Sequence, residues 1–582
     1  MKKFRLLYLL LALALLFASA CDKIDETSSE SKIASSDPSS PESSSVSENP
    51  PIDISDSSDE SFEYRSEDPD VSEDDHSSSS PSEDVSESSS ASSEKTVLTF
   101  VSLNDTHGYI EQDEDGECGL SNTAYGISTY SSFFGDDDPE TNTWDDVVLF
   151  ANGDMFQGTA VSNMSKGEAV VMAMNEMHFD GMGIGNHEFD WGIDTVLAYW
   201  DGDTSNGEAN FPLVNSNIIK KSKKNLLSDV SSSDNLFNSL LIEKMGVKIG
   251  LVSVIGPCEN SILQSEVADY DFDEVVYSVR ETALALREKG AEIVSVNIHF
   301  GNASGIDRYD ANRKIAELQN DDGSYLVDLI FNGHTHTSQR GLISRPGASP
   351  VPVVQAGGYN DALCYIKVEY ENKKVVVSEY GFRMISSFGK DYDKKVEAVI
   401  DEYVEKIGEH LPTLAVSAVS VYSKNYYSNY LSKIMLKAFN ASYSCFNTGC
   451  LRGPGGIDVG TKITEAHLYE VIPFDDAVYF VKIKGSALYD FYKDEGDYYV
   501  FGQGAAPDIS RLKGSNNYYT LAIIDYVYTS TYFAPYKKDV IEEHETGILL
   551  RDLLIEDVKI HGKKGVKWDT SKGAMIGQIY YP

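Results

Sequence analysis

Short apolar runs rich in β-branched residues alternate with amphipathic stretches across the middle of the chain. The apolar runs lie at 97–103, 146–152, 248–255, 292–299 and 327–332. Stretches with helical spacing separate them, as at 167–178 and 274–289. Short apolar runs predict buried strands, and strands that alternate with helices predict an α/β domain. We expect this domain to occupy residues 96–390.

The pattern changes in the last third of the chain. Residues 351–370 and then 372–382 predict antiparallel hairpins. Residues 391–410 place apolar side chains at helical spacing among charged ones, which predicts an amphipathic helix connecting two domains. From 411 to 582 a helix at 428–439 is mixed with short strands and glycine-rich turns. This mixture predicts a second domain, of the α+β class.

The N-terminus has the order of an export signal. Basic residues come first, an apolar stretch runs from Leu6 to Phe17, and small residues precede Cys21. A membrane-spanning helix is the alternative, but the apolar run is shorter than a bilayer requires. Residues 1–21 resemble a bacterial lipoprotein signal, which implies that Cys21 carries lipid and tethers the chain to a membrane without spanning it.

The segment 22–95 is dominated by Ser, Asp, Glu and Pro. Such a composition cannot bury enough apolar surface to fold, so we predict a disordered, extended spacer. A binding tail for a basic partner is the alternative. The segment holds 22 acidic and 4 basic residues, so it supplies −18 of the formal net charge of −44. No basic stripe occurs in the chain, which argues against a nucleic-acid polymer as partner.

The cysteines do not form a disulfide framework. Apart from Cys21 they are odd in number and scattered, at Cys118, Cys258, Cys364, Cys445 and Cys450. A pair between Cys445 and Cys450 across a turn stays open. A structural zinc knuckle is not supported.

Five polar blocks stand where apolar runs end. They are Asp105-Thr-His107, Gly153-Asp154, Gly185-Asn186-His187-Glu188, Asn297-Ile-His299 and Gly333-His334-Thr-His336. Parallel strands deliver side chains to ligands at their carboxyl ends, so these blocks should meet at one edge of the sheet. Imidazole, carboxylate and amide oxygen together suit Zn²⁺, Mn²⁺ or Fe²⁺, whereas Mg²⁺ or Ca²⁺ alone would use oxygen ligands. A lone histidine at a strand end would be an ordinary polar residue. Four histidines together with two aspartates and an asparagine predict a metal site: His107, His299, His334, His336, Asp105, Asp154 and Asn186.

The strings NDTHG, NGDMFQGT, GNHEFDWG, NIHFG and NGHTH resemble those of calcineurin-type metallophosphoesterases. The resemblance is strongest for the 5′-nucleotidase branch, which includes UDP-sugar hydrolases and cyclic phosphodiesterases, and it extends over 97–582. It implies a four-layer α/β/β/α sandwich followed by an α+β nucleotidase C-terminal domain. It also implies two divalent metal ions, whether Mn, Zn, Fe or Co.

Roles follow from the same resemblance. One metal would be held by Asp105, His107 and His336, the other by Asn186, His299 and His334, with Asp154 bridging them. Two cations close together need a shared anionic ligand, and water between them becomes a nucleophile near neutral pH. His187 resembles the family's catalytic histidine, and Asp190 the carboxylate that orients it. Glu188 is expected to have a structural role.

The second domain resembles the nucleoside-binding domain of 5′-nucleotidases less completely. Asn447 and Arg452 fall on its Asn-x-Gly-Gly-x-Arg motif, with Cys450 in place of the second glycine. Phe474 and Tyr526 are assigned to the same pocket, Tyr526 as a base-stacking residue. The alternatives are structural roles, in which Arg452 holds a loop in place and Tyr526 packs against a strand. The family's arginines before this motif are missing from 415–440, and its Gly-Gly-Asp-Gly string is replaced.

Together these features predict an extracytoplasmic, lipid-anchored and monomeric phosphoesterase that releases phosphate from nucleotides or other small phosphate esters. A 2′,3′-cyclic nucleotide phosphodiesterase and a nucleotide-sugar pyrophosphatase are the alternatives among enzymes. From another class, a catalytically idle surface protein that binds nucleotides is possible, but the complete ligand set argues against it.

Overall fold

The computed structural model describes residues 95–113, 115–129, 144–231, 235–408, 411–421, 423–452 and 457–582. These residues belong to one compact unit, Ser89–Pro582. The predicted signal at 1–21 and nearly all of the predicted spacer at 22–95 lie outside the described residues. Within the described part, no helix combines the length and apolar character needed to cross a membrane.

The first of two large sheets is built around the strands that precede the polar blocks. Its order is β16-β15-β1-β2-β3-β4-β7. The strands are β1 (Thr96–Leu103), β2 (Val147–Asn152), β3 (Gly181–Gly183), β4 (Leu213–Val214), β7 (Leu236–Phe237), β15 (Ala362–Glu371) and β16 (Lys374–Met384). From β1 to β7 neighbouring strands are parallel, whereas β15 joins β1 antiparallel.

The second large sheet has the order β13-β14-β12-β11-β9-β8. Its strands are β8 (Ser239–Lys244), β9 (Val247–Ile255), β11 (Ile293–His299), β12 (Leu329–Asn332), β13 (Gln339–Arg345) and β14 (Ala348–Gln355). The four central strands are parallel. The carboxyl ends of β11 and β12 therefore lie at the same edge of this sheet.

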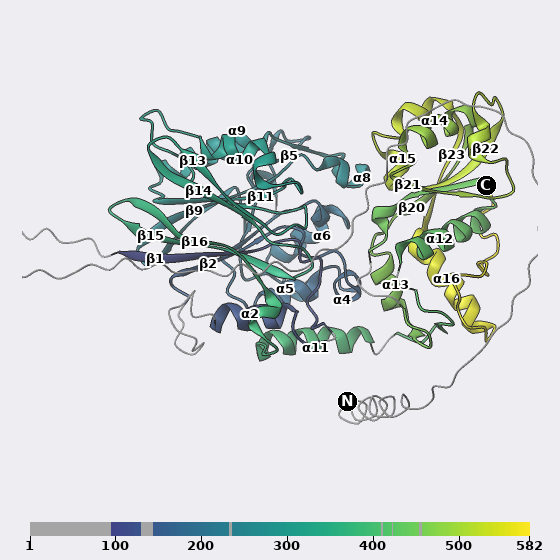
Figure 1. Ribbon diagram of the computed structural model, residues 1–582, viewed down its shortest axis with the longest axis horizontal. Helices are drawn as coiled ribbons and strands as arrows, with labels where there is room; N and C mark the ends of the chain where they lie inside the picture. Colours follow the sequence, from purple (N-terminus) through teal and green to yellow (C-terminus); the bar gives the residue numbers. More distant parts are fainter. Residues whose placement is uncertain are drawn as a thin grey trace, which may run out of the picture. The chain divides into compact units, whose positions relative to one another are not determined.

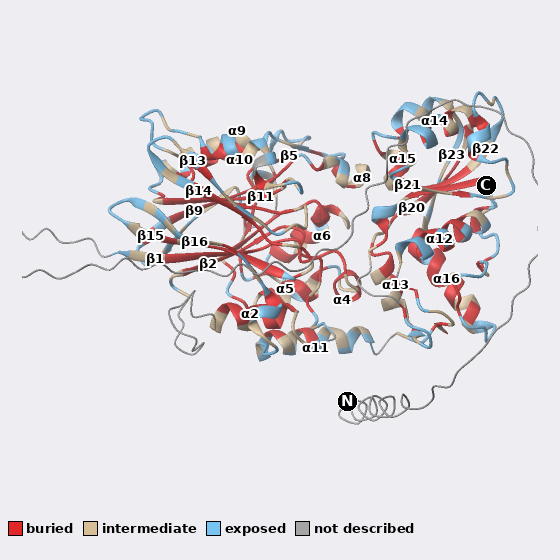
Figure 2. Cartoon of the chain, viewed as in Figure 1, coloured by how far each residue is buried: buried red, intermediate tan, exposed pale blue. Residues whose placement is uncertain are grey.

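The two sheets pack face to face and helices cover both outer faces. One apolar cluster joins Phe100 and Val148 of the first sheet to Leu251 and Phe331 of the second. Strands buried on both faces explain why the apolar runs are nearly continuous in sequence. In Figure 1, α9 and α10 lie on one side of the sandwich and α2 and α11 on the other, and Figure 2 shows the strands largely buried. The predicted four-layer α/β/β/α sandwich is confirmed.

The covering helices belong to separate apolar clusters. The first sheet is covered by α2 (Leu120–Thr129), α5 (Glu168–Met174) and α11 (Lys394–Gly408), with the short α4 (Ala160–Met164) and α6 (Ile193–Leu197) beside them. The second sheet is covered by α9 (Val275–Glu288) and α10 (Asp310–Ala316). A small sheet of β10 (Tyr270–Phe272), β5 (Ile218–Lys220) and β6 (Asn225–Leu226) completes this part, which we call the sandwich part.

Three details differ from or sharpen the sequence-based expectations. The hairpin of β15 and β16 is present, but β14 does not belong with it, because β14 pairs with β12 and β13 in the other sheet. The helix expected at 391–410 is present as α11, and its Val396 and Ile400 are buried in the core shared with α2 and α5. Cys445 and Cys450 are both unpaired.

The C-terminal part has a core of its own, formed between Leu414 and Ile576. Its main sheet has the order β21-β18-β22-β20-β23. These strands are β18 (Tyr443–Asn447), β20 (Ala477–Lys484), β21 (Tyr499–Gln503), β22 (Tyr518–Ile524) and β23 (Val540–Leu549); β17 (Ala415–Val416) and β19 (Lys462–Ile463) pair separately. Its helices are α12 (Lys424–Phe439), α13 (Glu465–Val471), α14 (Gly485–Glu495), α15 (Asp525–Thr529) and α16 (Leu550–Lys563). The predicted α+β class is confirmed.

Candidate metal centre and adjoining cavity

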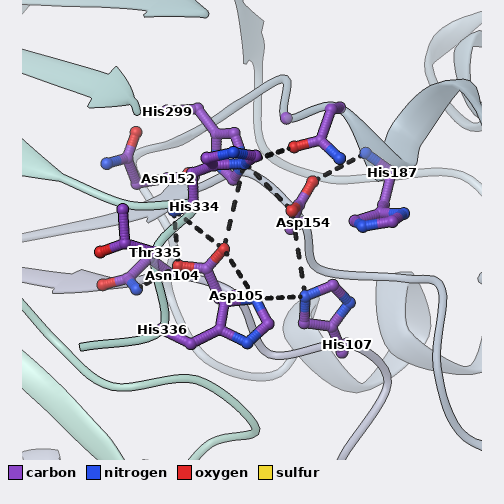
Figure 3. A network of polar contacts seen from close by, with 12 residues as sticks. Asn104, Asp105, His107, Asn152, Asp154, His187, His299, His334, Thr335 and His336 are labelled. Atoms are coloured by element: carbon purple, nitrogen blue, oxygen red, sulfur yellow. Dashed lines mark hydrogen bonds and ion pairs between the residues drawn. The ribbon is translucent and has the colours of Figure 1, made fainter. Parts of the chain in front are cut away.

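Every predicted metal-ligating residue stands at or just beyond the carboxyl end of a strand. Asp105 and His107 follow β1, Asp154 follows β2, Asn186 follows β3, His299 ends β11, and His334 and His336 follow β12. The backbone turns sharply at several of these positions, since φ lies between 50° and 71° at Asp105, His107, Asp154, His334 and His336. The turns direct the side chains to one place (Figure 3).

Two groups of potential ligand atoms result, and both include Asp154. In the first group, atoms of Asp105, His107, Asp154 and His336 all lie within 4.8 Å of one another, and in the second those of Asp154, His299 and His334 do. Nε2 of His107 and Nε2 of His336 are 3.0 Å apart. Nε2 of His299 lies 3.1 Å from Asp154 Oδ2. The structure therefore brings together the two predicted ligand sets around the predicted shared carboxylate.

Asn186 joins the second group through its side-chain oxygen. This oxygen lies 2.7 Å from His334 Nδ1 and 3.3 Å from His299 Nε2. Amide oxygen adds no charge, so a cation here would have fewer negative ligands than one in the first group. All seven predicted ligands thus face one small volume.

Backbone carbonyls fix the orientation of two imidazole rings. His107 donates from Nδ1 to the carbonyl oxygen of Gln157 at 2.8 Å, and His299 donates from Nδ1 to that of Asn152 at 2.8 Å. A carbonyl only accepts, so Nδ1 carries a hydrogen in both rings and Nε2 is the nitrogen directed at the centre. This is the tautomer that a metal ligand needs.

Glu188 holds two of the ligand-bearing loops together. One carboxylate oxygen accepts from the backbone N–H groups of Asp154 at 2.8 Å and Gly185 at 2.6 Å, and the other accepts from that of Met155 at 2.9 Å. The side chain is fully buried. Its place is therefore that of a clamp between loops, as the sequence suggested, and it belongs to neither ligand group.

Burial and charge shift the acidity of the ligands. Burial lowers the pKa of His334 and of His336 to about 4, so both rings are neutral at pH 7. Burial by itself would also lower the pKa of His299, but the charge and hydrogen bond of Asp154 outweigh it and raise the pKa of His299 to about 10. Burial, with the charge of Asp154, raises the pKa of Asp105 to about 7. Divalent cations fit this donor set, because they would replace the proton on His299 and offset the repulsion between the two carboxylates.

His187 is anchored beside the centre by Asp190. His187 Nδ1 and Asp190 Oδ2 are 2.7 Å apart, and the two side chains are only 10% and 13% exposed. Burial lowers the pKa of His187, but the charges of Asp190 and Asp154 outweigh it and raise that pKa above its ordinary value. Because Nδ1–H donates its hydrogen bond to the Asp190 carboxylate, Nε2 remains available to exchange a proton with a bound molecule.

A cavity of about 360 Å³ opens next to these residues. It is lined by Asp154, Asn186, His187, Asp190, Ser261, Leu263, His334, Thr335, His336, Asn447, Gly449, Cys450, Arg452, Phe474, Asp475, Asp476 and Tyr526. All four residues predicted to bind substrate are therefore here. Phe474 lies between two polar groups, its ring 5.6 Å from that of His187 and 5.4 Å from the Arg452 guanidinium.

A loop of the C-terminal part, residues 472–476, forms one wall of the cavity. Arg551 is buried and donates to the carbonyl oxygens of Ile472, Pro473 and Phe474, while it also pairs with Asp475. From the sandwich part, Lys166 Nζ lies 3.0 Å from Asp475. The loop is thus held from both parts of the chain.

The sequence-based predictions overlooked three residues around this loop. Asp475 and Asp476 directly follow Phe474, so the acidic pair beside a predicted pocket residue was an available signal. Arg551 is distant in sequence and gave none.

Comparison with known proteins agrees with this geometry. The profile of the calcineurin-like phosphoesterases matches residues 98–338, and that of the 5′-nucleotidase C-terminal domain matches residues 418–513. Protein 5NUC of Lutzomyia longipalpis is 25% identical over 469 residues, which cover 72% of this chain and 76% of that protein. The 5′-nucleotidase of Bos taurus is 24% identical over 427 residues, 67% of this chain and 70% of that protein.

Solved structures show the same fold. The 5′-nucleotidase precursor from Thermus thermophilus superimposes with a TM-score of 0.63 at 17% sequence identity. The superposition covers 84% of this chain and 100% of that one, so it includes both the sandwich part and the C-terminal part.

Proposed function

Because this chain belongs to the family of calcineurin-like phosphoesterases that carry a 5′-nucleotidase C-terminal domain, and is therefore a hydrolase of phosphoric ester bonds, we propose that it releases phosphate from nucleotides. The observation that carries the proposal is a single cavity with two kinds of lining. Its lining includes potential metal ligands as well as Arg452, Phe474 and Tyr526. A phosphate at the metal ligands and a nucleoside at the other residues would fill it.

The metal centre would hold two divalent cations. Asp105, His107 and His336 would hold one, and Asn186, His299 and His334 the other, with Asp154 shared. When bound, the cations supply positive charge for the phosphoryl oxygens and lower the pKa of water, which favours attack on phosphorus. Histidine and carboxylate ligands suit Mn, Zn, Fe or Co.

The side chains around the centre supply the remaining chemistry. His187 would give a proton to the leaving oxygen, with Asp190 holding its Nδ1 hydrogen and stabilising its positive charge. Arg452 would bind a phosphate or sugar oxygen through charge-assisted hydrogen bonds. Asn447 would hydrogen-bond the nucleoside, and Phe474 and Tyr526 would stack against its base.

A phosphatase assay tests the reaction. The purified chain with Mn²⁺ should hydrolyse p-nitrophenyl phosphate and AMP, and the Asp154→Asn variant should lose at least about a hundredfold in rate, because the shared ligand becomes neutral. Asp310→Asn, which alters an aspartate whose side chain is 70% exposed, is the matched control. Equal rates for Asp154→Asn and the parent would rule the mechanism out. Adding 2′,3′-cyclic AMP and a UDP-sugar to the panel separates the two alternative phosphoesterase activities.

We also propose that the enzyme works outside the cytoplasmic membrane as a monomer, tethered by lipid at Cys21. The order of residues in 1–21 supports this, and the spacer 22–95 would then hold the catalyst away from the membrane. Cys21→Ser, expressed in a bacterial host, should move the protein from the membrane to the soluble fraction. Unchanged retention on membranes would contradict the anchor, and light scattering of the released chain gives its oligomeric state.

The boundaries 96–390 and 411–582 remain our proposal for the two domains. Separate apolar cores support this division. The connecting helix at 391–410 packs on the sandwich part, so we place the boundary between the two domains after α11. Limited proteolysis should cut first near residue 410, and cuts within α11 would contradict this placement.

A further inference from the structure

Asp476 is an acidic residue of the cavity to which the proposed reaction gives no role. Its side chain lines the cavity, yet the residue is only 9% exposed. Its Oδ2 is buried and has no hydrogen-bond partner among the described residues. A buried oxygen without a partner costs stability unless another molecule provides a donor. The position is therefore poised to receive a hydrogen bond.

The charges around Asp476 do not provide that donor. Burial raises the pKa of Asp476 well above its ordinary value, and the carboxylates of Asp525, Asp190 and Asp475 raise it further. The cation that acts against this effect, Arg551, is already engaged with Asp475 and with three carbonyl oxygens. The neutral carboxyl group is therefore favoured, and its carbonyl oxygen still accepts. An incoming molecule that brings a hydrogen-bond donor suits this oxygen, whereas an anion does not suit this wall.

A second acceptor in the cavity has the same property. Asn447 Oδ1 is buried and has no partner among the described residues, and Asn447 lines the same cavity. Two unpaired acceptors from different strands and loops meet at one cavity. A ligand that fills it would therefore present donors at its edge.

The neighbours of Asp476 indicate what kind of ligand this is. Phe474 precedes it by two residues, and the Tyr526 phenol is close enough that the charge of Asp476 raises its pKa, after burial, to about 12. Both aromatic side chains line the cavity. A flat ring can stack against such faces while its edge meets the carboxyl group. Amino-bearing nucleobases combine a flat ring with N–H donors on the edge.

We propose that Asp476 is a specificity-determining residue, whose carboxyl oxygen accepts a hydrogen bond from an amino group on the edge of a nucleobase stacked against Phe474 and Tyr526. The inference deepens the proposed function and rests on it for the identity of the ligand as a nucleotide. Nucleotides with an amino-bearing base would then be favoured over those in which the same position lacks the amino group.

Binding of nucleosides by the whole chain tests the inference without any need for turnover. Two pairs differ only in an amino group: adenosine against purine riboside, and guanosine against inosine. Isothermal titration calorimetry should show at least one amino-bearing member binding about tenfold or more tightly than its partner, since a site that loses a buried hydrogen bond loses about this factor. Affinities within twofold in both pairs would overturn the inference, as would the absence of nucleoside binding.

Two variants assign the preference to the side chain. Asp476→Leu keeps a similar volume but removes both oxygens, so the ratio within the discriminating pair should fall to about one. The fold should survive, because an apolar residue replaces a buried acid in acidic surroundings, and a thermal melt verifies this. Asp476→Asn retains a carbonyl oxygen and should retain part of the preference. A ratio unchanged by Asp476→Leu would refute the assignment.

A control separates this inference from the proposed reaction. Asp497→Leu alters an exposed aspartate of the same part and should keep the ratio of the parent. Hydrolysis of p-nitrophenyl phosphate by the parent protein reports on the metal centre, because this ester has no nucleobase. Active protein without base preference would reject the role of Asp476 alone, whereas inactive protein with base preference would reject the proposed reaction alone.

Discussion

Replacing Asp190 by asparagine should slow the hydrolysis of esters with a basic leaving group. Asparagine has nearly the same shape and can still accept the hydrogen on His187 Nδ1, which lies 2.7 Å from the present carboxylate. What the substitution removes is the negative charge. Both side chains are almost fully covered, so solvent screens this charge only weakly. The positive form of His187 is therefore the species that the change destabilises.

The size of the effect follows from the single bond that is altered. A hydrogen bond to a charged partner contributes about 1.5–3 kcal/mol, against about 0.5–1.5 kcal/mol for a neutral pair. The difference of roughly 1–2 kcal/mol corresponds to a loss of about 5- to 30-fold in rate. Removing the imidazole itself, in His187→Ala, should cost more, about 10²- to 10⁴-fold.

The assay compares two leaving groups at saturating substrate. AMP expels an alkoxide that needs a proton, whereas p-nitrophenyl phosphate expels a stable phenolate that does not. Asp190→Asn should thus lower kcat for AMP by the factor above and kcat for p-nitrophenyl phosphate by much less. Asp194→Asn, four residues further on and exposed, is the matched control. An equal fall for both substrates would show that Asp190 supports the centre in some other way, and the reasoning about proton transfer would fail.

Three further predictions concern stability. Burial raises the pKa of Glu470 to about 7, above its unfolded value, so ionisation of Glu470 destabilises the folded protein as the pH rises from 4.5 to 7. Glu470→Gln should therefore raise the free energy of unfolding in urea by roughly 2 kcal/mol at pH 8 and change it little at pH 4.5. Arg551→Met should lower the free energy of unfolding by about 3–5 kcal/mol, because it leaves buried carbonyl groups and Asp475 without their partner. Lys166→Met breaks only a half-exposed ion pair and should lower it by less than about 1 kcal/mol. Similar losses for the two variants would contradict this ranking. Removing metal with a chelator should lower the melting temperature, and Mn²⁺ at a hundredfold its Kd should restore about 2.7 kcal/mol of folding free energy. The Asp154→Asn variant should show no such response.

The metal centre could be predicted from the sequence because its information is local. Each ligand stands next to the strand that delivers it, as Asp154 follows β2 and His334 follows β12. A short window therefore contains both the strand signal and the ligand. The convergence of the strand ends then follows from the general architecture of parallel sheets. No pairing of distant residues had to be guessed.

The rest depended on contacts between distant segments, which leave no local pattern. The apolar residues that begin the segment 351–370 predict a strand, but whether that strand pairs with β12 or with β15 depends on which face each strand must bury. The same holds for the cavity wall. Arg551 organises residues 472–475 from nearly 80 positions away, and nothing in its own window distinguishes it from a surface arginine. Asp476 looked like one more acidic residue in an acidic chain.

The backbone at the metal centre explains why its sequence signature is so strong. Five of the proposed ligands have φ between 50° and 71°, a conformation that costs a residue with a side chain about 1–2 kcal/mol each. The strain is held by hydrogen bonds between loops, such as Asp105 N–H to the Gly153 carbonyl at 3.1 Å and His107 N–H to the Asp154 carbonyl at 2.9 Å. Gly153 itself has φ +79°, and a Cβ there would lie 2.6 Å from the backbone nitrogen of Gly185.

Only a narrow set of residues satisfies these demands at once. Glycine fits a position that only has to turn left-handed and approach a neighbouring loop closely. A position that must also ligate a cation admits only the residue whose side chain supplies the ligand. Glu188 and the hydrogen bonds between loops hold these turns in place. Of the 15 non-glycine residues with positive φ in the described part of the chain, five are proposed ligands, so the strain is concentrated at this centre. The cavity wall at residues 472–476 contains no positive φ, so its residues are not restricted in this way.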